Sequence, residues 1–220
     1  MTQAQWIRRV VKPVAFAVCL VPAVLMVAGV FTGGLGSDPI KEITHRTGKT
    51  TLVMLLVTLS VTPLRRVTRI GALVTTRRML GLFAFFYAAL HFSTYLVLDQ
   101  FFAFGEILED IGKRPYITVG FTSFVLLIPL ALTSTKGWIK RIGGVRWNRL
   151  HQLVYVAAAG GFFHFLWLVK ADTRTPVIFG VVLVGLLATR LVGRRPRRTQ
   201  PRRQVAPAAE LPEAKRTIVA

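Results

Sequence analysis

The sequence predicts an all-α protein that crosses a membrane as a polytopic six-helix bundle with both termini in the cytoplasm. Hydrophobic residues make up 53% of the 220-residue chain, and the mean hydropathy is +0.53. Apolar stretches of about 18 residues are typical of membrane spans, and somewhat shorter ones span when they are tilted or extended by their flanks. Six apolar stretches follow one another, at 14–31, 50–64, 79–98, 116–133, 151–169 and 177–192.

The basic residues are concentrated in alternate connections between these stretches, so most of them lie on one side of the membrane. Most of the 29 Lys and Arg residues lie before the first stretch, after the second, after the fourth and from the end of the sixth onward. Positively charged loops stay in the cytoplasm, so these loops and both chain ends are expected on that side. The net charge of +20 therefore reflects membrane topology. Because the charges do not share one folded face, we exclude nucleic-acid binding.

The chain divides into three segments. We expect a cytoplasmic N-terminus at 1–13, a six-helix transmembrane domain at 14–192 and a basic cytoplasmic tail at 193–220. The tail is rich in Arg and Pro and has no apolar pattern, which is typical of disorder. Pro22 is expected to kink the first span.

A short amphipathic helix is expected at 39–47, before the second span. Asp38 suits an N-cap, and Pro39 suits the first helical turn. Gly48 is expected to separate this helix from the second span, because glycine disfavours a helix interior. Pro63 is expected to end that span.

Two histidines lie deep inside stretches that carry no Asp, Glu, Lys or Arg. His91 is 12 residues beyond Met79 at the cytoplasmic edge, which places it roughly 18 Å into the membrane. His164 is 13 residues beyond His151, or roughly 20 Å in. An ionisable residue at membrane depth indicates a functional site, and imidazole is a common axial ligand of haem iron. The matched depth favours a haem between His91 and His164 in the outer half of the bilayer.

Small residues precede both histidines by about one or two helical turns. Gly160 and Gly161 precede His164, whereas Ala84 and Ala88 precede the other histidine. A porphyrin between helices needs such neighbours, although small residues also serve close helix packing. Two other interpretations remain open. One is a hydrogen-bonded histidine that bridges two helices, and the other is a proton relay or transport site, which usually recruits Asp or Glu as well.

Several other side chains carry weaker signals. His151, at the cytoplasmic edge, is a third ligand candidate, either for a second haem or for the phosphate or ring of a flavin; otherwise it is an interfacial helix-start residue. His45 is expected at the outer surface, where it is too exposed for a ligand. Arg77 and Arg78 have a topology role, or else pair with haem propionates or a flavin phosphate. Cys19 is expected to be a small buried side chain.

Eight short strings follow one another along the chain. They are GLGSDPI at 34–40, THRTGK at 44–49, VTPLR at 61–65, TRRMLGL at 76–82, KRPYITVG at 113–120, ALTST at 131–135, RWNRLHQLVY at 146–155 and HFLWLVK at 164–170. Together these strings resemble the MsrQ (YedZ) family of haem-binding membrane subunits. The resemblance covers residues 30–192.

This resemblance implies a protein of the bacterial inner membrane with b-type haem and flavin mononucleotide (FMN). It also implies a partner, MsrP, a periplasmic molybdopterin enzyme that reduces methionine sulfoxide in oxidised proteins and so repairs a reversible lesion. The electrons would come from a cytoplasmic flavin reductase or from the quinone pool. Substrate chemistry would take place in the partner, so no catalytic residue is expected in this chain.

The family is similar, in turn, to the membrane domain of ferric reductases and NADPH oxidases, where two helices each carry two haem-ligating histidines. The fifth span keeps that pattern with His151 and His164, but Arg77 stands 14 residues before His91, where the pattern has histidine. The expected function is electron transfer across the membrane through haem, with His91 and His164 as ligands and His151 as the third candidate. The alternatives are a stand-alone ferric reductase and a histidine-based proton-coupled transporter.

Overall fold

The computed structural model describes residues 2–169 and 173–192, and within them the chain forms helices and no strands. The predicted tail at 193–220 lies outside the described residues. The elements are α1 (Gln3–Trp6), the π-helical turn η1 (Ile7–Val11), α2 (Lys12–Thr32), α3 (Pro39–Thr68), the 3-10 turn η2 (Gly71–Leu73), α4 (Val74–Ser93), the π-helical turn η3 (Thr94–Asp99), α5 (Phe104–Lys113), α6 (Pro115–Leu132), α7 (Lys136–Ile142), α8 (Gly144–Leu150), α9 (Leu153–Leu168) and α10 (Arg174–Val192).

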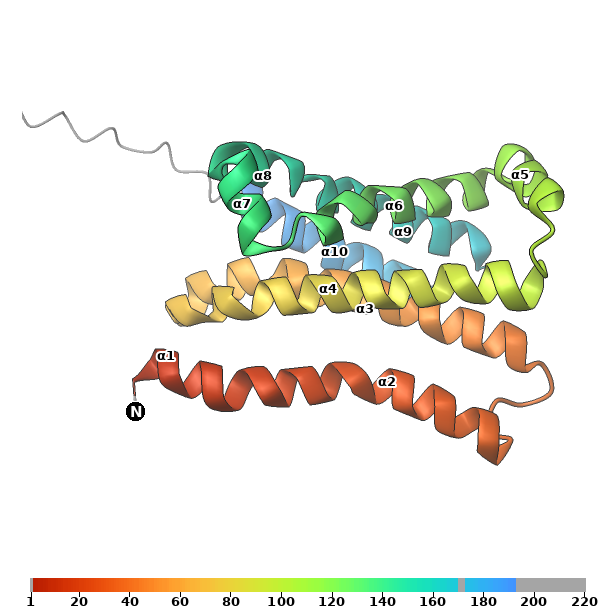
Figure 1. Ribbon diagram of the computed structural model, residues 1–220, viewed down its shortest axis with the longest axis horizontal. Coiled ribbons are helices and arrows are strands. Elements are labelled where there is room, and N and C mark those ends of the chain that lie inside the picture. Colours follow the sequence, from red (N-terminus) through yellow and green to blue (C-terminus); the bar gives the residue numbers. More distant parts are fainter. Residues whose placement is uncertain (1, 170–172, 193–220) are drawn as a thin grey trace, which may run out of the picture.

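The long helices run side by side, up and down (Figure 1). The closest pairs are α3 with α4 and α6 with α9, and α10 packs against α3 and α9. Helix α2 lies on the outside, against α3 and α4. The short helices cap the two ends of the bundle, with α5 at one end and α7 and α8 at the other (Figure 1).

This architecture confirms a polytopic all-α membrane protein. Four helical segments, Ile7–Thr32, Pro39–Thr68, Gly71–Asp99 and Pro115–Leu132, are long and apolar enough to cross a membrane by length and composition. Helix α9 is shorter, with 16 residues, and both α9 and α10 run alongside the others through the bundle. The outward faces of the bundle are apolar and exposed, as lipid contact requires. Examples on α2 and α10 are Val18, Val24, Phe31, Val181 and Val184.

Helix α3 differs from its predicted form, because it is one continuous helix rather than a short helix followed by a span. Asp38 does cap it, accepting a hydrogen bond from the Lys41 backbone N–H at 3.1 Å, and Pro39 opens it. Gly48, however, lies inside the helix. Its intrinsic cost of about 1 kcal/mol is offset by close packing against a histidine ring from α4.

Pro63 does not end α3, which continues for five more residues to Thr68. A proline inside a helix leaves the carbonyl four residues earlier without its N–H partner. Here that carbonyl belongs to Leu59, and it accepts a hydrogen bond from Arg190 Nη2 at 2.9 Å. A side chain from α10 therefore replaces the missing backbone donor. The helix ends only at Arg69, whose φ of 58° turns the chain into the left-handed region.

Tyr87 on α4 attaches α2 to the rest of the bundle. Its side chain is fully buried, and its hydroxyl donates to the Cys19 carbonyl at 2.6 Å and accepts from the Ala23 N–H at 3.1 Å. These two α2 groups are four residues apart and would ordinarily bond to each other. The hydroxyl thus contacts the helix backbone beside Pro22, and α2 continues through this proline to Thr32.

We expect Tyr87→Phe to loosen α2 without unfolding the bundle. The change removes one hydroxyl and leaves the ring in place, so it costs about 1 kcal/mol, as losing a typical hydrogen bond does. Thermal unfolding of the purified protein in detergent should show a lower Tm. Faster cleavage within residues 2–32 by added protease should accompany it. An unchanged Tm with unchanged cleavage would show that the hydroxyl does not hold α2.

Candidate functional site

His91 is held by the first turns of the neighbouring helix α3. Its Nδ1 lies 3.0 Å from the Thr44 carbonyl oxygen and 3.3 Å from the Thr47 hydroxyl. Only a protonated Nδ1 can donate to a carbonyl, so the neutral ring carries its lone pair on Nε2. Gly48 lies close to the ring, and a Cβ there would be 3.0 Å from His91 Cε1. Helix α3 therefore fixes both the tautomer and the position of this imidazole.

His164 on α9 is held in the same way by α6. Its Nδ1 donates to the Tyr116 carbonyl oxygen at 2.7 Å. Gly120 lies one turn further along α6, where a Cβ would be only 2.7 Å from His164 Nδ1. Any larger residue at that position would occupy the space of the ring. Both imidazoles are thus oriented by a carbonyl and a glycine from the helix beside them.

The structure brings these two histidines close together, with their rings edge to face. Their ring centroids are 6.1 Å apart with an interplanar angle of 67°, and both rings line one cavity. Two nitrogen–metal bonds of about 2 Å and two ring radii of about 1 Å also add up to about 6 Å. Metal-ligating histidines usually donate their other N–H to a carbonyl or carboxylate, as both do here. The pair therefore fits the two axial positions of a haem iron.

The cavity around the pair has a volume of about 630 Å³ and lies toward the α5 end of the bundle. Its inner wall is apolar and includes Leu55, Phe92 and Leu127, whereas basic side chains stand at its mouth. An apolar pocket of this size with a few convergent polar groups is typical of cofactor sites. The basic residues that line it are Lys41, His45, Lys49 and Arg114.

The small residues before each histidine have different roles. Ala88 and Gly161 line the cavity, and a Cβ on Gly161 would meet nothing within 4 Å. Gly160 instead provides close contact between α9 and α6, where it abuts Ser123. Ala84 is fully buried in the core. Only two of the four predicted small neighbours therefore belong to the cavity.

His45 is exposed, as predicted, but it also lines the mouth of the cavity. Acidic and basic groups share this end of the protein. The Asp110 carboxylate accepts from Arg114 Nε at 3.1 Å and from the Tyr95 hydroxyl at 3.1 Å. The charge of Asp110 is the main reason why the pKa of the exposed Arg114 guanidinium is raised above its usual value. Arg114 stays charged at any physiological pH.

His151 lies at the opposite end of the bundle, in the turn between α8 and α9, so it is separate from the cavity. Its ring stacks on Trp147 with centroids 3.8 Å apart, and its Nδ1 lies 3.1 Å from the Trp147 carbonyl. Trp147 is itself held by a hydrogen bond from its Nε1 to the Thr133 carbonyl at 2.8 Å. His151 Nε2 is buried and has no hydrogen-bond partner. An orphaned nitrogen of this kind is a potential ligand.

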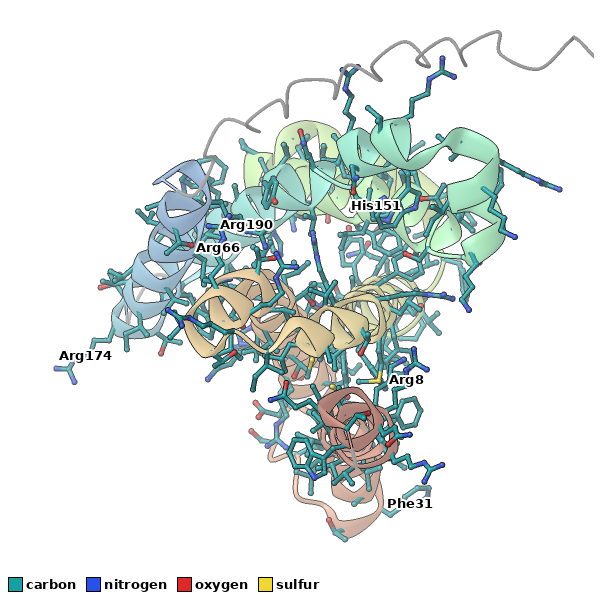
Figure 2. The ribbon with its side chains drawn as sticks, turned by 90° about the vertical axis from the view of Figure 1, so that its left-hand side faces the viewer. Arg8, Phe31, Arg66, His151, Arg174 and Arg190 are labelled. Atoms are coloured by element: carbon teal, nitrogen blue, oxygen red, sulfur yellow. The ribbon has the colours of Figure 1, made fainter. Side chains whose placement is uncertain are left out.

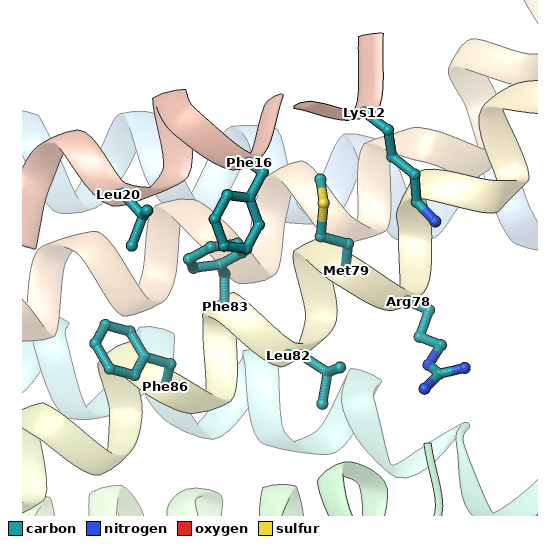
Figure 3. Close-up of a pocket in the computed structure, with 8 residues that line it drawn as sticks. All are labelled: Lys12, Phe16, Leu20, Arg78, Met79, Leu82, Phe83 and Phe86. Carbon is teal, nitrogen blue, oxygen red and sulfur yellow. The ribbon is translucent and has the colours of Figure 1, made fainter. Parts of the chain in front are cut away.

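Arg77 and Arg78 point in different directions from α4. Arg77 is half-buried and lies within electrostatic range of His151. Arg78 is exposed and lines, with Lys12, one end of a shallow groove of about 590 Å³ between α2 and α4 (Figure 3). The rest of that groove is apolar, and Phe16 and Phe83 meet across it (Figure 3).

The sequence did not predict the groups that hold the two histidines. We call these groups the cradle: the carbonyls of Thr44 and Tyr116 and the glycines Gly48 and Gly120. Thr44 and Gly48 belong to the string THRTGK, and Tyr116 and Gly120 belong to KRPYITVG. Neither string is next to His91 or His164 in the sequence. In the structure, however, each string contributes the carbonyl and the glycine that position one of these two histidines. No group of three or more His, Cys, Asp or Glu side chains in the described residues could hold a metal ion. A ligand set of two is what an axially ligated haem needs, because the porphyrin supplies the rest.

Comparison with known proteins gives consistent results. Residues 47–162 match the family described as ferric reductase like transmembrane component. Three similar relatives are each named protein-methionine-sulfoxide reductase heme-binding subunit MsrQ. The relative from Herminiimonas arsenicoxydans is 51% identical over 183 residues, covering 82% of this chain and 84% of the relative. Those from Xanthomonas campestris pv. campestris (strain 8004) and Rhodospirillum rubrum are each 49% identical, covering 80% of this chain and 80% and 85% of the relative, respectively.

Proposed function

The chain belongs to the MsrQ family of haem-binding subunits, within the ferric reductase-like membrane proteins, and from this premise we propose its function. It acts as the membrane electron-transfer subunit of a methionine sulfoxide reductase system in the bacterial inner membrane. It takes electrons from a cytoplasmic flavin reductase or the quinone pool and passes them to a periplasmic molybdopterin reductase of the MsrP type. The observation that carries this proposal is the close pair His91 and His164 in an apolar cavity.

In this proposal His91 and His164 would hold one b-type haem through the Nε2 atoms of their rings. When bound, that group supplies a one-electron carrier. The protein's own contribution is orientation. The carbonyls of Thr44 and Tyr116 accept the Nδ1–H of each ring, which keeps Nε2 deprotonated and strengthens it as a ligand. The apolar wall excludes water and lowers the local dielectric constant.

The mouth of the cavity suits the carboxylates of a haem. Lys41, Lys49 and Arg114 line it, and these three cations outnumber the two carboxylates of the lining, Asp38 and Asp99. Charge-assisted hydrogen bonds to carboxylates are stronger than neutral ones. We propose that this end faces the periplasm, because the opposite end carries most of the basic residues. The ligand pair then lies close to the side of the electron acceptor.

The proposal assigns His151 to electron uptake on the cytoplasmic side, and FMN to that side as the second cofactor. We expect His151→Ala to leave the outer haem in place but to slow its reduction severalfold when a flavin reductase with NADH is the donor. Stopped-flow absorbance of the reduced haem band measures this rate. His45→Ala, at the other end, is the control and should reduce at the wild-type rate. Equal rates for both variants would remove His151 from the electron path.

A reduced-minus-oxidised absorption spectrum of the detergent-purified protein tests the central claim. We expect a sharp low-spin b-type signal, with haem and protein quantified at about one haem per chain for one ligand pair. Absence of the signal in folded protein made with adequate haem would contradict the function. The name of the matching family also raises direct ferric reduction as an alternative. Rapid reduction of a ferric chelate by the isolated reduced protein would favour that alternative.

A further inference from the structure

Arg190 joins three helices at the basic end of the bundle. From the last turn of α10, its Nη2 donates to the Leu59 carbonyl at 2.9 Å and to Thr62 Oγ1 at 3.3 Å, both on α3. Its Nη1 donates to the Tyr155 hydroxyl on α9, and its guanidinium lies 4.8 Å from the centre of that ring. All of these acceptors are neutral, so the charge of Arg190 is oriented but not balanced by them.

A second arginine reaches the same tyrosine from α4. Arg77 lies within electrostatic range of Arg190 and within hydrogen-bonding reach of the Tyr155 hydroxyl. It also lies within electrostatic range of His151. Figure 2 views the molecule from this end and shows Arg190 and His151 both facing the interior between the helices. Two half-buried guanidinium groups and one imidazole thus converge on a small region.

This region contains no negative charge among the described residues. Every Asp and Glu in that part of the chain lies in 38–42 or 99–110, toward the other end of the bundle. The ion pairs formed there involve Glu42, Glu109 and Asp110. Like charges held close together and away from water destabilise each other unless an opposite charge joins them. The two arginines are therefore incomplete as a structural unit.

Two buried nitrogen atoms without hydrogen-bond partners lie in the region where Arg77, Arg190 and His151 converge. Among the described residues, two buried side-chain atoms lack a hydrogen-bond partner, namely Arg190 Nε and His151 Nε2. Buried polar atoms are nearly always paired, so the unpaired Arg190 Nε–H indicates a missing acceptor. His151 Nε2 carries a lone pair instead, because the Nδ1 of that ring donates to the Trp147 carbonyl. The acceptor must carry negative charge and more than one oxygen, because arginine pairs best with such groups.

We propose that Arg77 and Arg190 form an oxyanion-binding site at the basic end of the bundle, beside His151. The site takes the carboxylate or phosphate of a bound cofactor, and Tyr155 holds the two guanidinium groups in position. The proposal does not depend on the haem at the outer pair, because its residues are separate from that cavity. It assigns a charge-based role to the arginine that stands where the ferric reductase pattern has histidine.

The first experiment measures thermal unfolding of the full-length protein in detergent, with sodium phosphate against sodium chloride at matched ionic strength. At ten times the dissociation constant, phosphate should raise Tm by about 3 °C. Arg77→Gln and Arg190→Gln should each weaken phosphate binding at least about tenfold, as losing a charged hydrogen bond does. Arg78→Gln is the matched control, because Arg78 adjoins Arg77 but faces the groove beside α2.

The source of the oxyanion is distinguished by two further measurements on the same variants. If it is a haem carboxylate, haem above one per chain should be lost in Arg77→Gln, Arg190→Gln and His151→Ala. If it is a flavin phosphate, the wild type should bind FMN at least about tenfold more tightly than riboflavin, and the two arginine variants should lose this preference. Both results support the site and differ only in its ligand.

Two variants, Arg190→Lys and Arg77→Gln, distinguish loss of the oxyanion site from misfolding of the protein. The lysine variant retains the charge, and Arg77 makes none of the hydrogen bonds to α3 that support the helix at Pro63. If Arg77→Gln and Arg190→Gln match Arg78→Gln in phosphate stabilisation, haem content and FMN preference, the proposal is wrong. It is also wrong if phosphate binds only after Glu210 and Glu213 are both changed to Gln, since the chain would then supply its own anion.

Discussion

His91→Ala and His164→Ala are each expected to abolish the low-spin haem signal of the outer cavity. The centroids of the two rings are 6.1 Å apart, and no other histidine of the described residues lies inside the apolar part of the cavity. Losing either ring leaves one axial ligand and an apolar gap that no neighbour fills. The measurement is the reduced-minus-oxidised spectrum together with extracted haem per chain. We expect less than a tenth of the wild-type haem in each variant, because even second-sphere changes at metal sites cost roughly 10–100-fold in affinity.

His45→Ala is the control for this pair. His45 lines the same cavity but lies exposed at its mouth, so its loss should leave the signal largely intact. Size-exclusion chromatography and far-ultraviolet circular dichroism should show that all three variants remain folded. Retention of low-spin haem in both His91→Ala and His164→Ala would refute the ligand assignment, and with it the proposed function.

Gly120→Ala is expected to have the second-largest effect, although Gly120 has no side chain that could bind a cofactor. The added Cβ would be 2.7 Å from His164 Nδ1 and 2.9 Å from its Cγ, which real Cβ atoms do not tolerate. The ring must therefore shift and lose its hydrogen bond to the Tyr116 carbonyl at 2.7 Å. We expect haem affinity to fall by about 10–100-fold, the usual cost of disturbing the support of a metal ligand. Haem titration into the haem-free protein measures this affinity directly.

Glycine substitutions elsewhere provide a graded control. A Cβ on Gly48 would be 3.0 Å from His91 Cε1, so Gly48→Ala should weaken haem binding less than Gly120→Ala. Gly185 lies in α10, where an added Cβ would meet nothing within 4 Å, so Gly185→Ala should leave haem binding unchanged. The order Gly120, Gly48, Gly185 follows from distance alone. Any other order would show that the cradle does not position the rings.

The proximity of His91 and His164 could be predicted from the sequence because helix rise is regular. Counting residues from the membrane edge placed His91 and His164 at one depth, and the structure brings them to one cavity. What surrounds each ring depends on how neighbouring helices are rotated about their axes. The carbonyls of Thr44 and Tyr116 have no side-chain signature, so no sequence pattern identified them as acceptors.

The two misjudged features of α3 have a related cause. Gly48 and Pro63 both disfavour a helix interior, and local propensity therefore predicted breaks at each. Tertiary contacts override both, through the ring of His91 at one and the guanidinium of Arg190 at the other. These partners are 43 and 127 residues away along the chain, which is beyond the reach of any local rule.

The cradle also determines when, during synthesis of the chain, the cofactor site becomes complete. The two proposed ligands come from α4 and α9, whereas the groups that orient them come from α3 and α6. During synthesis the second ligand emerges only after α9 has entered the bilayer, so the pocket stays incomplete until most of the chain has been made. Haem captured at that moment stabilises all four helices together by mass action. Scarcity of haem would then leave newly inserted chains exposed to quality-control proteases, and cofactor supply would set how much protein accumulates.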